Sequence, residues 1–449
     1  MSRISPNGTW RNWAGNQRSR PTLIGRPRTE AEVVALVREA TANGRRVKVV
    51  GAGHSFTAIA RTDDVLVTLD DLAAVVDVDH DTGRVRVEAG IRLFDLNPML
   101  DAAGLAMPNL GDIAYQSVAG AISTSTHGTG LGFQGMATAV VGLRLVAGDG
   151  SVVVLDADHD PDLLEVARVG LGALGVVTEV TLQCVPAFNL HAVEEVLPLD
   201  EVLDGFDGWA GSTDHVEFFW MPHTGLALLK RNTRTSDAQP PARNRRHAVR
   251  RRWKRFKNRE LMENAVFGTF NHIGRLAPAL VPRLNGLVAS EGGRAEYLMT
   301  SHEVFASPRR VRFYEMEYGV PAQHGIEAFR RVREHVESLG RPISFPIEFR
   351  VLGSDDIPLS TSSGRPTAYI AVHVFRRTPY EDYFRGVEAI MDDYDGRPHW
   401  GKLHFQTMGT LADRYPQWDR FQAARARLDP RGRFANEYLD RVLGPTGRR

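Results

Sequence analysis

Residues 46–55 read RVKVVGAGHS, an apolar strand pattern that leads directly into a turn with two glycines, Gly51 and Gly53. Glycine adopts positive φ without strain and lets backbone N–H groups approach a phosphate closely. A Rossmann fingerprint would need a third glycine where Phe56 stands, so the turn is not typical of NAD binding. From the pattern alone, His54 is better explained as a hydrogen-bonded turn residue than as a ligand.

A second informative stretch, residues 117–130, reads SVAGAISTSTHGTG. It offers many backbone N–H groups and hydroxyls with little side-chain bulk, so it can wrap a pyrophosphate without cationic side chains. Val118 and Ile122 make it too apolar for a solvated linker. Residues 170–175, GLGALG, fit G-x-G-x-x-G as a string, but a helix precedes them and a strand follows, the reverse of an NAD-binding unit. We expect a close-packed turn there.

The N-terminal part of the chain alternates between helical and strand patterns, which is typical of an α/β lobe. Thr29 and Glu32 form a capping box at the start of a helix that Gly44 ends. Strands are expected at 65–69, 75–78, 85–88 and 176–182, and helices at 93–103 and 161–169. We expect this first lobe to span residues 1–185.

The middle of the chain, residues 186–395, has longer and more aromatic strand patterns. They cover residues 215–220, 310–318, 343–351 and 367–375, and a helical pattern covers 326–339. This favours an α+β lobe with an antiparallel sheet. Residues 396–449 are rich in aromatic residues, glycine and arginine, with a last helix at 418–428, and we expect them to return and complete the site.

Composition excludes several classes of protein. Of 449 residues, 43% are apolar and 24% charged, and 55 Lys and Arg balance 54 Asp and Glu, so the chain is neither wholly disordered nor a polyelectrolyte. The single cysteine, Cys184, excludes an internal disulfide framework and a cysteine-based metal site, and no metal site is predicted. Since no secretory or membrane-spanning pattern is visible, we expect a cytoplasmic protein.

One segment departs from the overall charge balance. Within an expected insertion at about 232–260, Arg243–Arg259 carries ten Arg and Lys and no Asp or Glu. It is explained either as a solvated insertion or as a docking patch for an acidic partner, an anionic lipid or nucleic acid. A nucleic-acid partner is not predicted, because the chain as a whole carries a charge of only +1, whereas a peripheral membrane contact stays open.

The stretches at 51–55 and 117–130 resemble the vanillyl-alcohol-oxidase type of FAD-binding flavoproteins. The closest resemblance is to the aldonolactone oxidases, and the alditol oxidases are similar. Residues 346–350 (PIEFR), 397–402 (RPHWGK) and 429–436 (DPRGRFAN) resemble the same group, so the resemblance covers nearly the whole chain. It implies a two-lobe α+β fold in which a PCMH-type FAD-binding domain carries an antiparallel-sheet cap domain for the substrate.

The resemblance implies FAD as the cofactor, held covalently by a bond from His54 to the 8α carbon of the flavin. Such a bond makes the flavin a stronger oxidant. Gly111 would lie beside the flavin's reactive edge, where a small residue favours access of O2 and hence an oxidase over a dehydrogenase. The residues implied in cofactor binding are Val50, Gly51, Ala52, Gly53, His54, Ser55, Gly111, Asp112, Ser117, Gly120, Thr124, Ser125, Thr126, His127, Val177 and His373.

Glu348 and Arg350 alternate on a strand and therefore face the same side, where they offer an acceptor and a fork of donors to a polyhydroxylated substrate. From the pattern alone, a same-face ion pair is the simpler explanation, but the resemblance implies a catalytic role. It also implies that Lys402 stabilises negative charge at the flavin edge, and that His399 orients the substrate alcohol or takes its proton. Phe375 stands where alditol oxidases have a substrate-binding threonine.

The implied reaction is oxidation of an aldono-1,4-lactone, namely L-gulono-, L-galactono- or D-arabinono-1,4-lactone, to ascorbate or an analogue. A hydride passes to the flavin, the hydroxyl proton is lost, and O2 or another acceptor reoxidises the flavin. Phe375 favours a cyclic lactone, which leaves oxidation of an alditol such as xylitol or sorbitol as the alternative. A non-catalytic binding protein that uses the basic segment is an alternative of another class.

Overall fold

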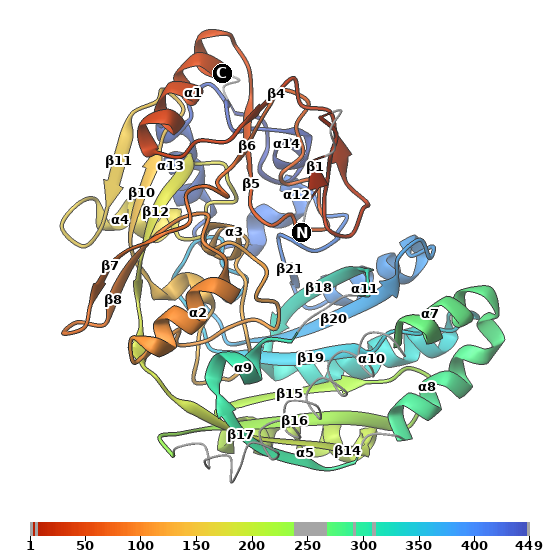
Figure 1. The fold of residues 1–449 in the computed structure, drawn as a ribbon. Coiled ribbons are helices and arrows are strands. Elements are labelled where there is room, and N and C mark those ends of the chain that lie inside the picture. The colour runs from red at the N-terminus through yellow and green to blue at the C-terminus, as the bar shows by residue number, and fades with distance from the viewer. Residues whose placement is uncertain (1–2, 5–7, 238–266, 291–292, 308–310, 447–449) are drawn as a thin grey trace.

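The glycine turn follows an edge strand of a small parallel sheet (Figure 1). The sheet has the order β4-β6-β5, and these strands span Leu23–Gly25, Val65–Thr68 and Val47–Val50. Helix α1 (Glu30–Ala42) covers it, because Val33 and Val37, one turn apart, pack with the apolar side chains of β5 and β6. The predicted helix cap forms: Oγ1 of Thr29 accepts a hydrogen bond from the backbone N of Glu32 (3.2 Å).

The computed structural model describes residues 3–4, 8–237, 267–290, 293–307 and 311–446. An antiparallel five-stranded sheet, ordered β11-β10-β12-β8-β7, completes the first lobe. Its strands are β7 (Val75–Asp79), β8 (Arg84–Glu88), β10 (Val140–Val146), β11 (Val152–Leu155) and β12 (Val176–Gln183). Three helices share one apolar core with this sheet: α2 (Leu93–Ala102), α3 (Val118–Ser123) and α4 (Pro161–Ala167).

The second lobe is an eight-stranded antiparallel sheet with helices on one face (Figure 1). Its order is β17-β14-β16-β15-β19-β20-β18-β21. The strands are β14 (Asn189–Pro198), β15 (His215–Trp220), β16 (Leu226–Thr235), β17 (Ala295–Thr300), β18 (Phe313–Pro321), β19 (Ile347–Leu352), β20 (Thr367–Phe375) and β21 (Arg397–Pro398). Apolar residues of this sheet pack against α5 (Leu199–Ser212), α10 (Gly325–Ser338) and α11 (Glu381–Asp392).

The two faces of this sheet differ because strand residues alternate in direction. On β19, Ile347, Phe349 and Val351 belong to the apolar core shared with the helices. Glu348 and Arg350 therefore point to the opposite face, which meets the first lobe. The alternation of one short strand thus places two charged side chains at the junction between the lobes.

The C-terminal segment returns to the first lobe. The backbone N of Val47 donates to O of Arg433 (2.7 Å), and N of Phe56 donates to O of Gly401 (2.7 Å). The side-chain amide of Asn436 donates to three carbonyls of the loop after the glycine turn (2.9–3.1 Å). Two helices accompany this return, α13 (Trp418–Leu428) and α14 (Glu437–Leu443).

Short elements connect these parts. The strands are β1 (Arg3–Ile4), β2 (Trp10–Arg11), β3 (Arg18–Ser19), β9 (Leu105–Ala106) and β13 (Val185–Pro186). The helices are α7 (Phe267–Leu276), α8 (Val281–Ser290), α9 (Ser301–Phe305) and α12 (Met408–Leu411). The 3₁₀ turns are η1 (Met136–Ala139), η3 (Pro278–Leu280), η4 (Ala322–His324) and η5 (Ala412–Arg414).

The predicted strand at 343–351 begins four residues too early, since β19 starts at Ile347. Ile343 makes its hydrogen bonds to side chains instead of a neighbouring strand: its N donates to Nε2 of His223 (2.9 Å), and its O accepts from Asn285 (2.9 Å). Pro346 has no N–H to offer a ladder. An apolar pattern alone does not reveal such side-chain partners.

The basic segment Arg243–Arg259 lies outside the described residues. The insertion was expected to start at about 232, but Asn232 belongs to β16, where it pairs with His215 of β15. Among the described residues, no helix combines the length and the apolar character that a membrane span needs.

Asn436 provides a test of how the C-terminal segment is held. Besides its three donated bonds, its Oδ1 accepts from N of Leu439 and caps α14 (2.9 Å). We expect Asn436→Ala to lower the free energy of unfolding by about 2 kcal/mol, since it loses a helix cap and leaves carbonyls unsatisfied. Asn43→Ala, which removes one exposed bond to Glu39, is the control and should change it by less than about 0.5 kcal/mol. Equal effects in urea denaturation would contradict this account.

Candidate active site

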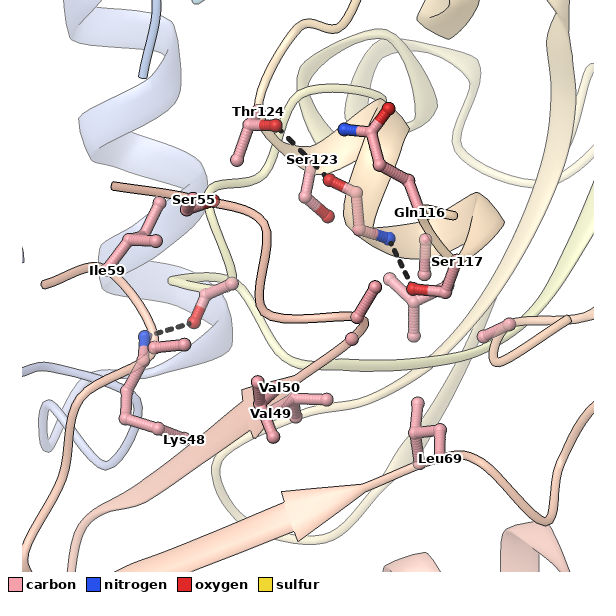
Figure 2. A pocket seen from close by; sticks show the side chains of 18 of the residues that line it. Lys48, Val49, Val50, Ser55, Ile59, Leu69, Gln116, Ser117, Ser123 and Thr124 are labelled. Carbon is pink, nitrogen blue, oxygen red and sulfur yellow. Dashed lines mark hydrogen bonds between the residues drawn. The ribbon is translucent and has the colours of Figure 1, made fainter. Parts of the chain in front are cut away.

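A cavity opens in the first lobe where β5 ends (Figure 2). The predicted residues that line it are Val50, Gly51, Ala52, Gly53, His54, Ser55, Ser117, Gly120, Thr124 and Val177. Residues of the turn at 170–175 also line the cavity. The sequence pattern predicted only a close-packed turn there and no role in the cavity. Helix α4 precedes this turn and strand β12 follows it, which is the order that the sequence predicted.

The glycine turn needs glycine for two separate reasons. At Gly51, a Cβ atom would overlap Oγ of Ser117, the residue that caps α3 by accepting from N of Gly120 (3.2 Å). Gly53 has φ of +68°, in the left-handed region that favours glycine. The backbone of the turn therefore passes close to α3 and lies open to the cavity.

His54 lines the cavity, and one nitrogen of its imidazole has no hydrogen-bond partner among the described residues. Its Nε2 atom is buried and makes no hydrogen bond within the described part of the chain. The indole of Trp13 stacks on the ring (centroids 5.2 Å apart), and Tyr115 lies at 6.1 Å. Burial lowers the pKa of His54 to about 3, so the imidazole is neutral at physiological pH. A neutral, oriented nitrogen without a partner suits bonding to a ligand in the cavity.

Lys48 is a lining residue that sequence analysis missed. Its Nζ donates to O of Gly172 (3.1 Å) and to O of Phe434 (2.9 Å), so it ties β5 to the turn at 170–175 and to the C-terminal segment. Burial lowers the pKa of Lys48 to about 7. An apolar strand pattern gives no sign of such a role, since the partners are backbone carbonyls far away in the sequence.

The other predicted cofactor residues lie between this cavity and the cap sheet. A Cβ atom on Gly111 would lie 3.1 Å from O of His127. Ser125 adopts φ of +61°, and its hydroxyl lies 3.4 Å from that of Ser360 in the second lobe. Oγ1 of Thr126 accepts from the amide of Gln116 (3.0 Å). Residues 117–130 therefore extend from the cavity to the junction between the lobes.

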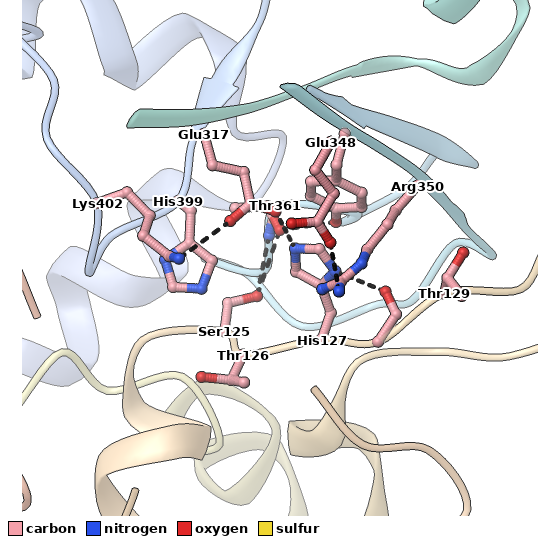
Figure 3. A network of polar contacts seen from close by, with 12 residues as sticks. Ser125, Thr126, His127, Thr129, Glu317, Glu348, Arg350, Thr361, His399 and Lys402 are labelled. Atoms are coloured by element: carbon pink, nitrogen blue, oxygen red, sulfur yellow. Dashed lines mark hydrogen bonds and ion pairs between the residues drawn. The ribbon is translucent and has the colours of Figure 1, made fainter. Parts of the chain in front are cut away.

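Glu348 and Arg350 lie at this junction, and both are buried (Figure 3). Their side chains form an ion pair. Nε of Arg350 also donates to Oε2 of Glu217 on β15 (2.7 Å), and one guanidinium nitrogen lies 3.8 Å from Asp112 of the first lobe. One guanidinium thus faces three carboxylates, which fixes its position.

The surroundings of Glu348 favour its protonated form. Burial raises the pKa of Glu348 to about 8; Arg350 opposes the shift, and Asp112 and Glu217 add to it. A carboxyl with this pKa exchanges its proton near neutral pH, as a general base or acid does.

A second pair of acids, Glu315 and Glu317, was missed by sequence analysis. They alternate on β18 in the sequence FYEMEYGV and are buried. The ammonium of Lys402 pairs with Glu315 and lies 3.8 Å from Glu317. Nε2 of His373, on the neighbouring strand, lies 3.5 Å from Glu315. Two acids with i, i+2 spacing in an aromatic strand are the signal that could have revealed them.

These contacts keep the second pair ionised. Burial disfavours charge, yet His127 and Lys402 hold the pKa of Glu317 well below its ordinary value. Likewise, burial disfavours the ammonium of Lys402, but Glu315 and Glu317 outweigh it and raise the pKa of Lys402. The site therefore contains a fixed cation between two fixed anions.

His127 lies between two hydrogen-bond acceptors (Figure 3). Its Nδ1 is 2.9 Å from O of Gly128, and its Nε2 is 3.0 Å from Oε1 of Glu317. A carbonyl and a carboxylate accept hydrogen bonds, so both ring nitrogens must donate, and only an imidazolium does this. The ring of Tyr369 stacks on it at 3.7 Å, a favourable place for a cation.

His399 is buried beside this network and is neutral. Its Nδ1 accepts from N of Gly401 (3.0 Å), so its hydrogen is on Nε2, and burial lowers the pKa of His399 to about 4. Donor atoms of His127, Glu317 and His399 lie within 4.8 Å of one another, close enough to ligate a metal ion. The ammonium of Lys402, 3.8 Å from Glu317, disfavours a second cation there.

Comparison with known proteins gives one family. Residues 180–442 match the D-arabinono-1,4-lactone oxidase family, and residues 21–156 match an FAD binding domain. The chain is 45% identical to L-gulono-1,4-lactone dehydrogenase of Mycobacterium tuberculosis, over 97% of this chain and 99% of that protein. It is 32% identical to L-gulonolactone oxidase of Bos taurus, over 97% and 98%.

Among solved structures, a solvent-stable cholesterol oxidase superposes with a TM-score of 0.82, over 98% of both chains. Its sequence is only 21% identical, so it supports the fold alone: the predicted α+β fold is confirmed. The FAD binding domain match confirms the predicted cofactor, and the cavity suits it, with an open glycine backbone and a buried imidazole nitrogen that lacks a partner. The chain belongs to the D-arabinono-1,4-lactone oxidase family of FAD-dependent oxidoreductases.

Proposed function

We propose that this protein oxidises an aldono-1,4-lactone, of the L-gulono, L-galactono or D-arabinono series, to ascorbate or an analogue. The observation that carries the proposal is the buried pair Glu348–Arg350 at the lobe junction, together with relatives named as lactone oxidases and dehydrogenases. The alternatives are not favoured, because these relatives match over nearly the whole chain. Phe375, which lies in an apolar cluster with Phe345 and Phe313, offers no hydroxyl to a linear polyol.

Bound FAD supplies a two-electron acceptor for the hydride of the carbinol carbon. The protein must then take the hydroxyl proton, and Glu348 is suited to this because its raised pKa lies near neutrality. Arg350, which Glu217 fixes through its Nε, donates to the substrate oxygen and orients it. His399 offers a hydrogen on Nε2, so it orients the same alcohol as a donor and does not act as the base.

Lys402 and the His127 imidazolium supply positive charge next to the reacting centre. Bound FAD would gain negative charge on accepting a hydride, and these preorganised cations would stabilise that charge without rearrangement. Glu315 and Glu317 hold these cations in place and are positioning residues. His54 would hold FAD covalently at the flavin 8α carbon; this bond would replace a C–H bond of the 8α methyl group and the imidazole N–H bond, and the flavin ring itself would take up the two electrons and the hydrogens. Its neutral imidazole and its Nε2 atom, which lacks a protein partner, support this.

Bound FAD would then pass its two electrons to O2, with release of H2O2, or to another acceptor. Gly111 allows close packing, because a Cβ atom there would lie 3.1 Å from the backbone O of His127 and 3.2 Å from Cγ2 of Thr126.

The substrate class is tested by the flavin absorption band. Anaerobic addition of L-gulono-1,4-lactone or D-arabinono-1,4-lactone to the holoprotein should bleach the band, because electrons then reside on the cofactor. Xylitol should bleach it far more slowly. Bleaching by xylitol alone would show the lactone proposal to be wrong.

The covalent link is tested by acid precipitation. The wild-type pellet should be yellow, and the pellet of His54→Ala colourless, because only a covalent flavin survives denaturation. We also expect this variant to lose most of its activity. His80→Ala, which alters a histidine outside the cavity lining, is the control and should leave a yellow pellet. A colourless wild-type pellet would contradict the link.

The role of Glu348 is tested by the pH dependence of kcat/KM. Only the carboxylate accepts a proton, and burial raises its pKa to about 8, so kcat/KM should rise with pH and level off above that value. Glu348→Gln should lower kcat by about 10²–10⁴-fold and remove this rise. Glu334→Gln, an exposed change on α10, is the control. A variant that keeps both its flavin spectrum and the wild-type pH profile would exclude Glu348 as the base.

A further inference from the structure

The helix pair α7–α8, with the turn η3 between them, exposes an unusual amount of apolar surface. Leu276 is 79% exposed and Leu287 57%, and Ile273 and Leu280 are about 40% exposed (39% and 40%). The pair lies at the outer edge of the second lobe, beyond the end of the large sheet (Figure 1). We call these four side chains the α7–α8 apolar face.

The apolar face is held in place by contacts on the opposite side of the helices. Asn271 accepts from Oγ of Ser344 (2.6 Å), and Asn285 donates to the carbonyls of Pro222 and Ile343 (2.9 Å each). Since Asn271 and Asn285 point inward, helical spacing directs Ile273 and Leu287, each two residues further along, outward. The four apolar side chains are therefore exposed on helices that are fixed to the rest of the lobe.

The helix pair itself carries charge of one sign. Residues 267–290 contain Arg275 and Arg283 and no Asp or Glu, and both arginines are exposed. Neither forms an ion pair with a described residue. In the sequence, residues 243–266, which precede α7, contain ten Arg and Lys and two Glu (Glu260 and Glu263), and Glu291 follows α8. This charge complements an anionic surface, whereas a second copy of the same face would bring like charges together.

We propose that the α7–α8 apolar face docks on an anionic lipid bilayer. The leucines and the isoleucine enter the boundary between headgroups and acyl chains, and Arg275 and Arg283 pair with anionic headgroups. Such a surface-lying helix pair needs no membrane-spanning segment. The proposal is independent of the reaction proposed above, because none of these residues belongs to the catalytic or cofactor-binding set.

Docking at this face would bring the membrane close to the face of the large sheet that carries the candidate active site. On α7, the ring of His272 contacts that of Phe375 edge-on (centroids 4.8 Å apart). Phe375 ends β20, two residues after His373, and packs in the apolar cluster that also contains Trp13 and Phe56 of the first lobe. The docking element is thus one side chain away from the strand that borders the active site.

The test is sedimentation of the full-length holoprotein with lipid vesicles. We expect binding to vesicles in which about a third of the lipid is phosphatidylglycerol, weak binding to pure phosphatidylcholine, and a decrease with salt. Leu276→Ser/Leu287→Ser should weaken partitioning at least about tenfold, because two apolar side chains are lost from the boundary. Arg275→Gln/Arg283→Gln should weaken binding to the anionic vesicles alone. Turnover of dissolved substrate should be unchanged in both variants.

Met99→Ser is the matched control, since Met99 is an exposed apolar residue (53%) on α2 of the other lobe, and it should bind vesicles like the wild type. The proposal is overturned if wild type does not sediment with anionic vesicles, or if Leu276→Ser/Leu287→Ser binds as well as wild type. It is also overturned if the wild type forms a dimer that this variant dissolves, or if vesicle binding appears only after deletion of residues 243–259. Dimer dissociation would assign the face to a second copy of the chain. Binding only after the deletion would assign it to residues 243–259 of the same chain.

Discussion

Burying a carboxylate costs several kcal/mol unless a cation accompanies it, and this requirement constrains how the charged groups at the lobe junction are arranged. Glu317 and Glu348 are buried on the face of the cap sheet that meets the first lobe. Glu317 meets His127 of the first lobe and Lys402 of the C-terminal segment, while Glu348 meets Arg350 of its own strand. Each buried acid therefore needs its cation in the observed place, so the junction has one favoured arrangement.

The same pairing divides the acids into two kinds. Glu317 faces two cations, and its pKa stays well below the ordinary value. Glu348 has only Arg350, which it shares with Glu217 and Asp112, and its pKa rises to about 8. Similar burial therefore produces a permanent anion at one position and an exchangeable proton at the other, a division typical of sites that move protons.

Much of the fold could be predicted because local patterns were consistent with it. Strands β15 and β20 and helix α13 have the bounds that apolar periodicity indicated. Strands β10 and β14, in contrast, were not predicted at all, and β14 pairs with both β16 and β17 across long stretches of sequence. Their stability comes from neighbours that a local window does not contain.

In the candidate site, too, features with a local sequence signal could be predicted, and features that depend on remote partners could not. The glycine turn could be found because its backbone demands specific residues, and the alternation of Glu348 and Arg350 gave their common direction. Lys48 and Glu317 were missed because their partners, backbone carbonyls in one case and an imidazole in the other, come from remote segments. Sequence carries the residue types, but the charge balance of a site depends on what the fold brings together.

Hydrogen-bond partners also bear on the two roles that the resemblance left open for His399, orienting the substrate alcohol or taking its proton. The Nδ1 atom of His399 is already occupied by N of Gly401, and with a pKa of about 4 the ring stays neutral. Its remaining nitrogen carries a hydrogen, so it can donate to a substrate alcohol but has no lone pair with which to take a proton. Glu348 has that capacity near neutral pH, and from this difference we infer that the histidine orients the alcohol and the carboxylate accepts its proton.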